Sequence, residues 1–358
     1  MKTTRVISFC MALAMCIAML TACAGDKNMD AETQPIISQT SSQAIEEVGI
    51  VNPFTGETGY SEELLKTRPV AVMINNIGAA LPQSGIADAD IIYEMPVEGP
   101  VTRLMAVFSD YKSMPNIGSI RSARHDYVEL LKPMNALYLH FGGSAAGKEA
   151  IFNNKIDDID GLSFSNVAFY KDKERAKTKS SEHCWFSNGK LLQAGIEKKG
   201  FDTAMEPIAS LFDFAKPGED MMADNASAKV ANEITAPISS GTKASFTYDL
   251  KTQTYSKGQN GKPHLDTNKN AAVQSTNVFL MYTDVGYLAD NYHKEITMAK
   301  GTGYYISNGK AIDVTFKKAS VDEAIKVYSA DGVEIKVNVG KSYFCVVPNS
   351  QREKLIIQ

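Results

Sequence analysis

Short apolar runs separated by turn residues open the part of the chain that is expected to fold. Residues 68–74 form one such run, which ends at a pair of asparagines and is typical of a buried strand. Residues 90–97 and 101–108 form two more, and the short connection through Gly99 and Pro100 suits a hairpin. The pattern therefore predicts one buried strand followed by a β-hairpin.

Helical and extended patterns then alternate along the chain. Apolar residues recur at helical spacing over 122–131, about 145–153 and 190–199. Residues 136–141 and 164–170 are expected to be strands. This alternation predicts an α/β domain, built on a mixed sheet.

A change of composition divides the chain. Residues 216–240 are polar and small, and indicate a linker. The short strands expected beyond it lie at 247–249, 253–255, 278–282, 303–306, 311–316 and 342–347. Asn308-Gly309 is a hairpin turn between two of them, because both residue types tolerate positive φ. The fold class is therefore an N-terminal mixed-sheet α/β domain at 51–215, followed by a smaller, mostly antiparallel β domain at 241–358.

The first residues have the pattern of a secretory signal of the lipoprotein type. Lys2 and Arg5 provide a positive start, an apolar run follows, and small residues lead directly into Cys23. The run is shorter than the roughly 20 residues of a membrane-spanning helix. We expect removal of residues 1–22, acyl chains on Cys23, a flexible tether at 23–50, and a location on the extracytoplasmic face of the cell membrane. The alternative is an ordinary secretory signal with a chance cysteine.

Charge and cysteine content exclude some classes of protein. The net charge after loss of the signal is about −6 and no run of Lys and Arg is present, so no nucleic-acid partner is expected. No spacing typical of a metal site or a phosphate-binding loop occurs, so neither metal nor cofactor is expected. Cys184 and Cys345 remain in the mature chain, and we expect two free thiols, although an oxidising compartment permits a disulfide.

Basic residues gather at the start of the helix predicted over 122–131. Arg121 and Arg124 are three positions apart, and on a helix they would project from neighbouring positions. The first turn of a helix attracts anions, and guanidinium groups suit carboxylates and phosphates. The arginines are therefore candidates for an anion site. Pairing with Glu94, Glu98 or Asp126, to stabilise the sheet, is the alternative.

A glycine-rich turn is the second candidate. His140 lies near the end of a predicted strand, and Gly142, Gly143 and Ser144 connect it to the next helix. Open α/β sheets bind ligands at such strand ends, and the serine is suited to cap the helix. A tight turn without a ligand is the alternative.

Four further residues have either catalytic or structural roles in this interpretation. Glu94 and Arg103 are expected to face one another across the hairpin as an ion pair. Glu98 is a candidate general base. His183 precedes Cys184, but adjacent side chains point apart, so a Cys–His nucleophile is not favoured. Without a nucleophile–base pair, the sequence favours a binding protein over an enzyme.

A series of motifs resembles, in order, those of the YerB-like lipoproteins, a bacterial family of unknown function. In the N-terminal part they are Asn52-Pro53-Phe54-Thr55-Gly56, Arg68-Pro69-Val70-Ala71-Val72-Met73-Ile74-Asn75-Asn76, Pro82-Gln83-Ser84-Gly85-Ile86, Ala89-Asp90-Ile91-Ile92-Tyr93-Glu94, Arg121-Ser122-Ala123-Arg124 and Gly142-Gly143-Ser144. In the C-terminal part they are Gln259-Asn260-Gly261-Lys262-Pro263-His264, Gly301-Thr302-Gly303-Tyr304 and Asp331-Gly332-Val333-Glu334-Ile335. The resemblance covers about 51–348. It implies a lipid-anchored, two-domain envelope protein of Gram-positive-type bacteria, without implying an activity.

The leading interpretation is a binding module of the cell envelope, anchored to the membrane. Its ligand would be an anionic group of a cell-wall polymer or an envelope protein, held by Arg121, Arg124, His140 and the glycine-rich turn. Two alternatives remain open. One is a hydrolase or transferase acting on the cell wall, with Glu98 or His140 as the base. The other is an adaptor for a membrane-bound protein of cell-wall synthesis.

Overall fold

The computed structural model of the protein describes residues 49–358, which lie within one compact unit. The expected signal peptide, Cys23 and nearly all of the expected tether lie outside the described residues. Within the described part, no helix combines the length and the apolar character needed to cross a bilayer.

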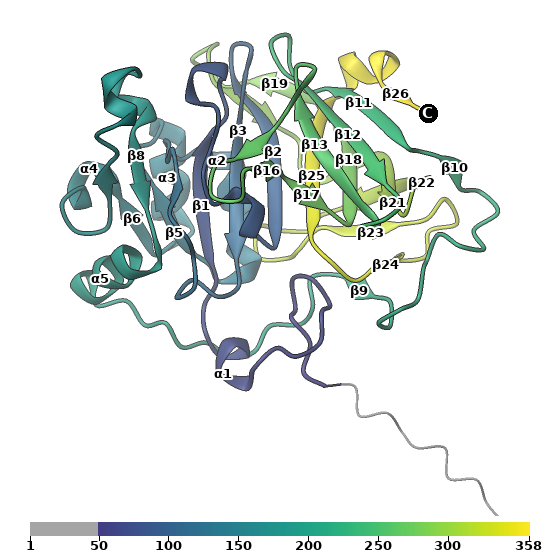
Figure 1. Cartoon of the computed structure of the whole chain (residues 1–358), viewed down its shortest axis with the longest axis horizontal. Helices are drawn as coiled ribbons and strands as arrows, with labels where there is room; N and C mark the ends of the chain where they lie inside the picture. The colour runs from purple at the N-terminus through teal and green to yellow at the C-terminus, as the bar shows by residue number, and fades with distance from the viewer. Residues whose placement is uncertain (1–48) are drawn as a thin grey trace, which may run out of the picture. The chain divides into compact units, whose positions relative to one another are not determined.

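A mixed sheet of eleven strands extends through the folded part (Figure 1). In spatial order its strands are β10 (Lys229–Val230), β22 (Lys310–Lys317), β21 (Lys300–Ser307), β18 (Asn277–Thr283), β25 (Ser342–Pro348), β2 (Ile91–Glu98), β3 (Val101–Phe108), β1 (Val70–Asn75), β5 (Leu137–His140) and β6 (Asp158–Asp160), and β23 (Lys326–Tyr328) pairs with β22. β25 lies between β2 and β18 and is parallel to both. A strand from the end of the chain therefore joins the N-terminal and C-terminal parts in one sheet.

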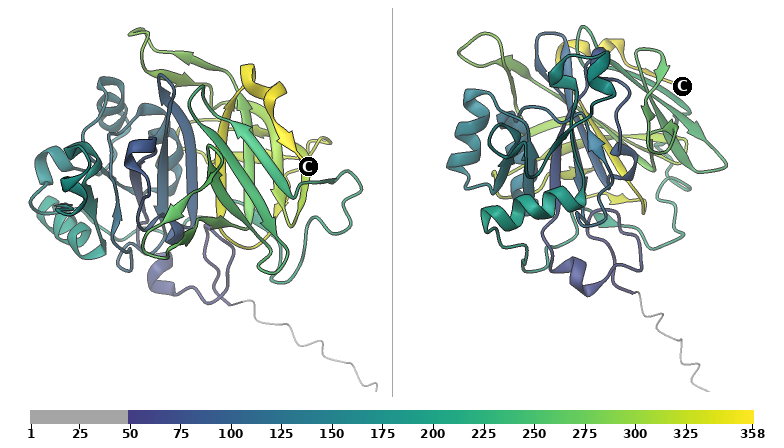
Figure 2. Two further views of the ribbon diagram at one scale, coloured as in Figure 1. Left: turned by 45° about the horizontal axis from the view of Figure 1, so that its top comes forward. Right: turned by 60° about the vertical axis from the view of Figure 1, so that its left-hand side comes forward.

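The two faces of this sheet are covered by different elements. One face, which includes Val72 and Leu104, packs against α5 (Gly189–Lys199) and a second sheet. The strands of the second sheet are β14 (Lys262–Pro263), β13 (Thr254–Gln259), β12 (Lys243–Asp249), β11 (Glu233–Pro237) and β26 (Ile356–Ile357), with β17 (Gln274–Ser275) beside β13. The other face, which includes Met73 and Met105, is covered by α2 (His125–Leu131) and α3 (Ala145–Asn153). Figure 2 shows these layers from two further sides.

Short elements complete the fold. The small sheets are β4 (Ile117–Gly118) with β8 (Trp185–Ser187) and β7 (Tyr170–Lys171), β9 (Asp213–Phe214) with β24 (Lys336–Val337), β15 (Leu265–Asp266) with β16 (Ala271–Ala272), and β19 (Val285–Tyr287) with β20 (Lys294–Ile296). The remaining α-helices are α1 (Glu62–Leu65) and α4 (Gly161–Phe164). The 3₁₀ turns are Gly78–Ala80, Ile86–Asp88, Lys132–Met134, Arg175–Lys177, Ser181–His183 and Asn349–Lys354.

The structure confirms the predicted α/β class with a mixed sheet followed by mainly antiparallel strands. The hairpin β2–β3, the buried strands β1 and β5, and the helices α3 and α5 lie within a few residues of the predicted ranges. The turn at Asn308 and Gly309 has the expected positive φ values of 46° and 72°. Local patterns were sufficient to predict these elements, because apolar periodicity reflects which side chains are buried and turn residues reflect the local backbone geometry.

Two predicted segments are wrong. The helix expected over 122–131 begins only at His125, because Arg124 is extended, with φ −132° and ψ 148°. The strand expected over 164–170 is mainly a turn that follows α4, and only Tyr170 belongs to a strand, β7; the cap of α4, Asp160, accepts a hydrogen bond from the N–H of Leu162. In both places local side-chain and loop hydrogen bonds outweigh the apolar pattern.

Candidate functional site

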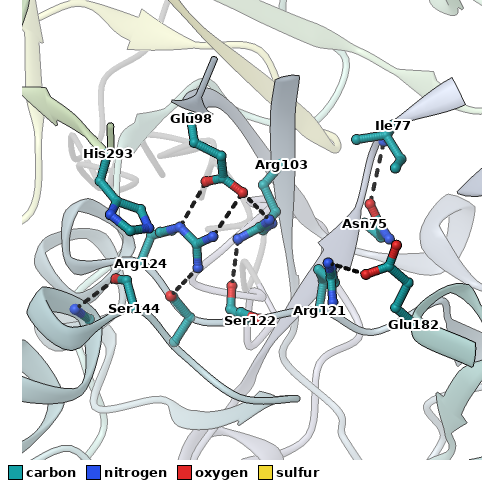
Figure 3. Close-up of polar contacts among 12 residues, drawn as sticks. Asn75, Ile77, Glu98, Arg103, Arg121, Ser122, Arg124, Ser144, Glu182 and His293 are labelled. Carbon is teal, nitrogen blue, oxygen red and sulfur yellow. Dashed lines mark hydrogen bonds and ion pairs between the residues drawn. The ribbon is translucent and has the colours of Figure 1, made fainter. Parts of the chain in front are cut away.

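Two loops meet at the ends of β1 and β5, and they carry Arg121, Arg124 and Ser144 of the predicted site (Figure 3). The N–H of Arg121 donates to the carbonyl of Met73 at 2.9 Å, and the N–H of Phe141 donates to the carbonyl of Arg121 at 3.0 Å. The N–H of Ala123 donates to the carbonyl of Gly142 at 2.9 Å. β1 and β5 are parallel, so both end at the edge of the sheet where open α/β sheets bind ligands. The loops lie at the predicted edge, although the arginines are on a loop and not on a helix.

Arg103 and Arg124 share the carboxylate of Glu98 in a buried cluster (Figure 3). Arg124 binds it bidentately, with Nε 2.9 Å from Oε2 and Nη2 2.8 Å from Oε1, and Nη2 of Arg103 lies 2.9 Å from Oε1. Further N–H groups of the two arginines donate to the carbonyls of Ser122 and Ala123, at 3.0 and 2.8 Å. Two positive charges therefore face one negative charge. We call Glu98, Arg103 and Arg124 the arginine cluster.

The charges of the arginine cluster determine how its members ionise. Burial raises the pKa of Glu98, but the positive charges of Arg103 and Arg124 outweigh this effect, and the pKa is lowered. Burial, reinforced by the charge of Arg124, lowers the pKa of Arg103 to about 10. At neutral pH Glu98 and Arg103 are therefore both charged. Glu98 is bound on both oxygens, which disfavours the general-base role.

Several polar atoms in and beside the cluster are buried without a hydrogen-bond partner among the described residues. They are Nε of Arg103, the hydroxyl of Tyr138 and both ring nitrogens of His125. The ring of His125 lies 3.2 Å from the carboxylate of Asp126, but without hydrogen-bond geometry. Burial lowers the pKa of His125. Because an unpaired buried polar group costs free energy, these atoms favour a polar group bound beside them.

Arg121 lies apart from the cluster, at the surface. Its Nη2 is 2.6 Å from Oε2 of Glu182, and 30% of its side chain and 47% of the glutamate side chain are exposed (Figure 3). The next residue, His183, turns inward, and its Nδ1 accepts a hydrogen bond from Nδ2 of Asn75 at 2.9 Å. Of the predicted arginines, Arg121 is the one whose guanidinium reaches solvent.

His140 and the glycine-rich turn stabilise the loops. Nδ1 of His140 is 2.8 Å from the carbonyl of Gly142, and its Nε2 is 3.0 Å from Oδ2 of Asp158. Gly142 has a φ of 73°, which a side chain would make unfavourable. Ser144 accepts a hydrogen bond from the N–H of Gly147 at 3.0 Å and caps α3, as predicted. The buried imidazole therefore holds the turn against β6.

Glu94 does not face Arg103. The register of the hairpin pairs Glu94 with Leu104 and Met95 with Arg103. Because successive side chains of a strand point to opposite faces, Glu94 and Arg103 lie on opposite sides of the sheet. The predicted ion pair is therefore wrong, and Arg103 pairs with Glu98 instead.

Glu94 belongs instead to a buried polar ring. Its carboxylate accepts hydrogen bonds from Nδ2 of Asn76 at 2.9 Å and from the hydroxyl of Tyr343 at 2.7 Å. Nζ of Lys257 lies 3.3 Å from the same carboxylate, and 0% of the glutamate side chain and 1% of the lysine side chain are exposed. Lys257 also lies 3.5 Å from Nδ1 of His264. The carboxylate thus connects residues from both ends of the chain.

Gln83 closes the ring. Its Oε1 lies 2.5 Å from Nε2 of His264, and its Nε2 donates to Oδ1 of Asn76 at 3.1 Å. Burial, and then the charge of Lys257, lowers the pKa of His264 well below its usual range, so the imidazole is neutral. A neutral His264 that donates from Nε2 accepts at Nδ1, and every donor of the ring then faces an acceptor. We call Asn76, Gln83, Glu94, Lys257 and His264 the Glu94 ring.

Glu94 is predicted from the sequence as a site residue, but its partners in the ring are not. Gln83 and His264 lie within motifs that carry the family resemblance, which is the signal that was present. They are 181 positions apart, and Glu94 and Tyr343 are 249 positions apart. A local sequence pattern cannot predict which side chains come into contact when they are this far apart in the chain.

The thiols, the serine and the possible metal ligands of the described residues can be placed one by one. Within residues 49–358, no three His, Cys, Asp or Glu side chains are grouped to hold a metal ion. Cys184 and Cys345 are buried free thiols, as expected, and burial raises the pKa of Cys345 well above its usual value. The hydroxyl of Ser144 is engaged as a helix cap. What the arrangement offers is fixed positive charge at a strand edge.

The fold and the site together define a class: a two-part α/β protein in which one mixed sheet carries a polar cluster on each face. Residues 54–202 match the N-terminal domain, and residues 234–344 the C-terminal domain, of the family described as "Protein of unknown function (DUF3048)". The chain belongs to this family, which confirms the YerB-like resemblance.

The protein is similar to YerB of Bacillus subtilis (strain 168), whose name describes it as a lipoprotein. The two are 27% identical over 304 residues, which cover 83% of this chain and 86% of YerB. The crystal structure of the YerB protein from Bacillus subtilis superimposes with a TM-score of 0.75 at 23% identity, and covers 86% of this chain and 99% of that chain. This likeness shows the shared fold.

Proposed function

We propose that the protein is a lipid-anchored binding module on the extracytoplasmic face of the cell membrane, and that Arg121 binds an anionic group of the cell envelope. Cys23, after its signal sequence, is the proposed attachment point for acyl chains. The lipoprotein name of YerB supports this anchor. The ligand is a carboxylate or phosphate of a cell-wall polymer.

The observation that carries the proposal is the exposed pair of Arg121 and Glu182. Exposed ion pairs contribute only about 0–1 kcal/mol, so a ligand anion can replace the glutamate at little cost. Arg124 differs, because its bidentate pair with Glu98 is buried and separating such a pair costs several kcal/mol. Arg121 is therefore the exchangeable cation, and Arg124 holds the loop.

The surroundings of Arg121 favour an anion as well. The arginine cluster carries one positive charge more than its carboxylate neutralises, and partly buried charge is screened less by salt than surface charge. Gly142, Gly143 and Ser144 place the start of α3 beside the same loop, through hydrogen bonds to Ala123. The dipole of α3 adds a favourable potential for an anion.

A binding role is better supported than the hydrolase or transferase alternative. Glu98 is held by two arginines, and both ring nitrogens of His140 are engaged. Neither group is free to accept a proton from a substrate. An adaptor for a protein of cell-wall synthesis would use the same exposed arginine on a protein carboxylate, and the experiment below separates it from a polymer ligand.

Co-sedimentation with purified sacculi, with and without teichoic acid, tests the proposal. The protein is the mature chain with Cys23→Ser, which removes the site of lipidation, and Arg121→Gln is compared with Arg352→Gln, at an exposed arginine of the 3₁₀ turn Asn349–Lys354. We expect binding that falls at least tenfold in Arg121→Gln and is unchanged in Arg352→Gln. Glu182→Gln should bind more tightly, because it removes the internal competitor for Arg121.

Three results would count against the polymer site. If the wild-type protein stays in the supernatant, the polymer site is excluded and a protein partner is favoured instead. Binding that Arg121→Gln retains removes Arg121 as the contact. Binding that falls in Arg352→Gln as much as in Arg121→Gln would show that net charge alone controls sedimentation.

A further inference from the structure

A second group of cations lies on the surface beside Arg121. They occupy every second position of residues 171–179, so they form no continuous run in the sequence: Lys171, Lys173, Arg175, Lys177 and Lys179. Together with Arg121 they outnumber the nearby carboxylates of Asp172, Glu174 and Glu182 by three, in a protein whose net charge is −4. We call residues 171–182, together with Arg121, the cationic face.

Three of these cations gather around the buried imidazole of His183. Burial lowers the pKa of His183, and the positive charges of Arg121, Lys179 and Arg175 lower it further, while the carboxylate of Glu182 opposes them. Charges act on one another in this way only over short distances, because water and salt screen them. Arg121 therefore lies close to the cations of residues 171–179, although it belongs to a different loop.

Arg175 and Lys179 fix the loop of the cationic face and keep their charges. Nη1 of Arg175 donates to the carbonyl of Pro82 at 2.9 Å. Nζ of Lys179 donates to the carbonyls of Ala79 and Leu81, at 2.6 and 3.0 Å. These acceptors are neutral backbone groups. The positive charges are therefore held in place without being cancelled.

The carboxylates of the cationic face leave the excess of positive charge in place. Oδ1 of Asp172 accepts a hydrogen bond from the backbone N–H of Arg175 at 2.9 Å. Glu174 pairs with Lys177, but 82% of the glutamate side chain and 66% of the lysine side chain are exposed. Exposed pairs of this kind are weak, so an anion from solution can compete for the lysine. Lys173 is exposed as well, and the ion pairs among residues 49–358 do not include it.

The cationic face offers little apolar surface. Ala176 is the one apolar residue in its segment 171–182, and hydroxyl groups are added by Thr178, Ser180 and Ser181, of which all are exposed. Protein partners and membranes are bound largely through apolar and aromatic side chains, which this segment does not provide. A ligand that fits is a hydrophilic chain that repeats a negative charge and carries hydroxyl groups.

We propose that the cationic face binds a linear phosphodiester polymer with a polyol backbone, through several phosphates at once. This ligand rests on the function proposed for Arg121, and narrows it from any anionic group to a chain of phosphates. One phosphate replaces Glu182 on Arg121. Others pair with Lys173, Lys177 and Lys179. Lysine binds phosphate as a point charge on a flexible stem, so exposed lysines suit a flexible chain.

Fluorescence anisotropy with a dye-labelled poly(glycerol phosphate) chain tests this ligand, on the mature protein with Cys23→Ser. Each phosphate contact on a flexible single strand contributes about 0.7 to the slope of log affinity against log salt. With four contacts we expect the affinity to fall about 50-fold between about 0.05 and 0.2 M salt. Monomeric glycerol phosphate should compete at least about a hundredfold less well, because linked contacts reinforce one another.

A pair of lysine substitutions measures the contribution of the loop. Lys173→Gln with Lys177→Gln leaves the contacts that fix the loop intact, and should reduce the fall over the same salt range to about 7-fold, with weaker binding at low salt. Lys251→Gln with Lys300→Gln, at two exposed lysines of the C-terminal part, changes the net charge equally and should bind like the wild type. Arg121→Gln should also weaken binding of the polymer.

The possible failures are distinguishable. Equal affinity of the two double variants for the polymer overturns the proposed ligand and leaves the function proposed for Arg121 intact. Poly-L-glutamate or phosphatidylglycerol vesicles that bind as tightly as the polymer also overturn it, because the face would then select charge alone. If the wild type does not bind the polymer, this ligand is excluded, and the sacculi decide separately whether Arg121 binds another anion. Full affinity in Arg121→Gln contradicts the proposed function itself, and this ligand with it.

Discussion

The arginine cluster and the Glu94 ring lie on opposite faces of the same hairpin, yet they are built differently. Thr102 donates to Glu94 on one face, and the next residue, Arg103, pairs with Glu98 on the other. The arginine cluster holds two cations and one carboxylate, and 13% of the Glu98 side chain is exposed. In the ring, one carboxylate meets one ammonium, and neither is exposed by more than 1%.

This difference distinguishes the arginine cluster, which has unbalanced charge, from the Glu94 ring, which connects distant parts of the chain. The ring is electrically balanced and each of its hydrogen-bond donors has an acceptor, so no donor is left free for a ligand. The arginine cluster has an excess of positive charge and unpaired polar atoms beside it. Residues near in sequence supply the cluster, from Glu98 to Arg124, whereas the ring draws on both ends of the chain. The ring, which joins distant parts of the chain, is satisfied internally, whereas the arginine cluster near the proposed anion contact Arg121 is not.

Loss of the charge of Glu94 should give the largest effect. Glu94→Gln keeps hydrogen-bonding groups but leaves Lys257 as an unpaired buried cation, so we expect a loss of about 4 kcal/mol in the free energy of unfolding. Urea denaturation measures it. Glu94→Gln with Lys257→Met is the control, and should recover most of the loss. A single variant that loses less than about 1 kcal/mol would contradict the role of the ring in connecting distant parts of the chain.

Glu98→Gln should have the next largest effect. It leaves the guanidinium groups of Arg103 and Arg124 close together without their carboxylate, and we expect a loss of about 3 kcal/mol, which added salt reduces. Thermal unfolding at low and high salt measures it. Glu174→Gln breaks an exposed pair with Lys177 and serves as the control, with an expected loss below about 0.5 kcal/mol. Equal losses in the two variants would mean that the cluster is as weak as a surface pair.

Asp126, next to the arginine cluster, should give a smaller and pH-dependent effect. Burial, and then the nearby charges of Glu129 and Glu295, raises its pKa from 3.8 to about 7. The folded protein therefore holds this proton more tightly than the unfolded chain, and the stability it contributes is present below 3.8 and lost as the pH rises towards 7.

Asp126→Asn removes this dependence and keeps an acceptor for the N–H of Ile296. We expect the variant to gain about 2 kcal/mol over the wild type at pH 8, and to show a difference that shrinks towards pH 4. Melting temperatures measured between these values test it. A difference that is constant across the range would show that Asp126 is ionised in the folded state.

The candidate site was predictable in part. Arg121, Arg124, His140 and the turn at Gly142 come together at the expected edge, because strand ends followed by glycines and basic residues are visible locally. Their pairing was not visible. Whether Arg124 meets Glu94 or Glu98 depends on the register of the hairpin, and a shift of one residue moves a side chain to the other face.

The sequence by itself determined the elements that depend on neighbouring residues: the strands of the hairpin, the cap at Ser144, the turn at Asn308, and the α/β class. Only the tertiary structure decided that β25 lies between β2 and β18, and that Gln83 meets His264. The reason is physical. A local pattern reports burial and backbone geometry, whereas contacts between distant residues depend on which strand edges pair, and the free energy of that choice belongs to the whole sheet.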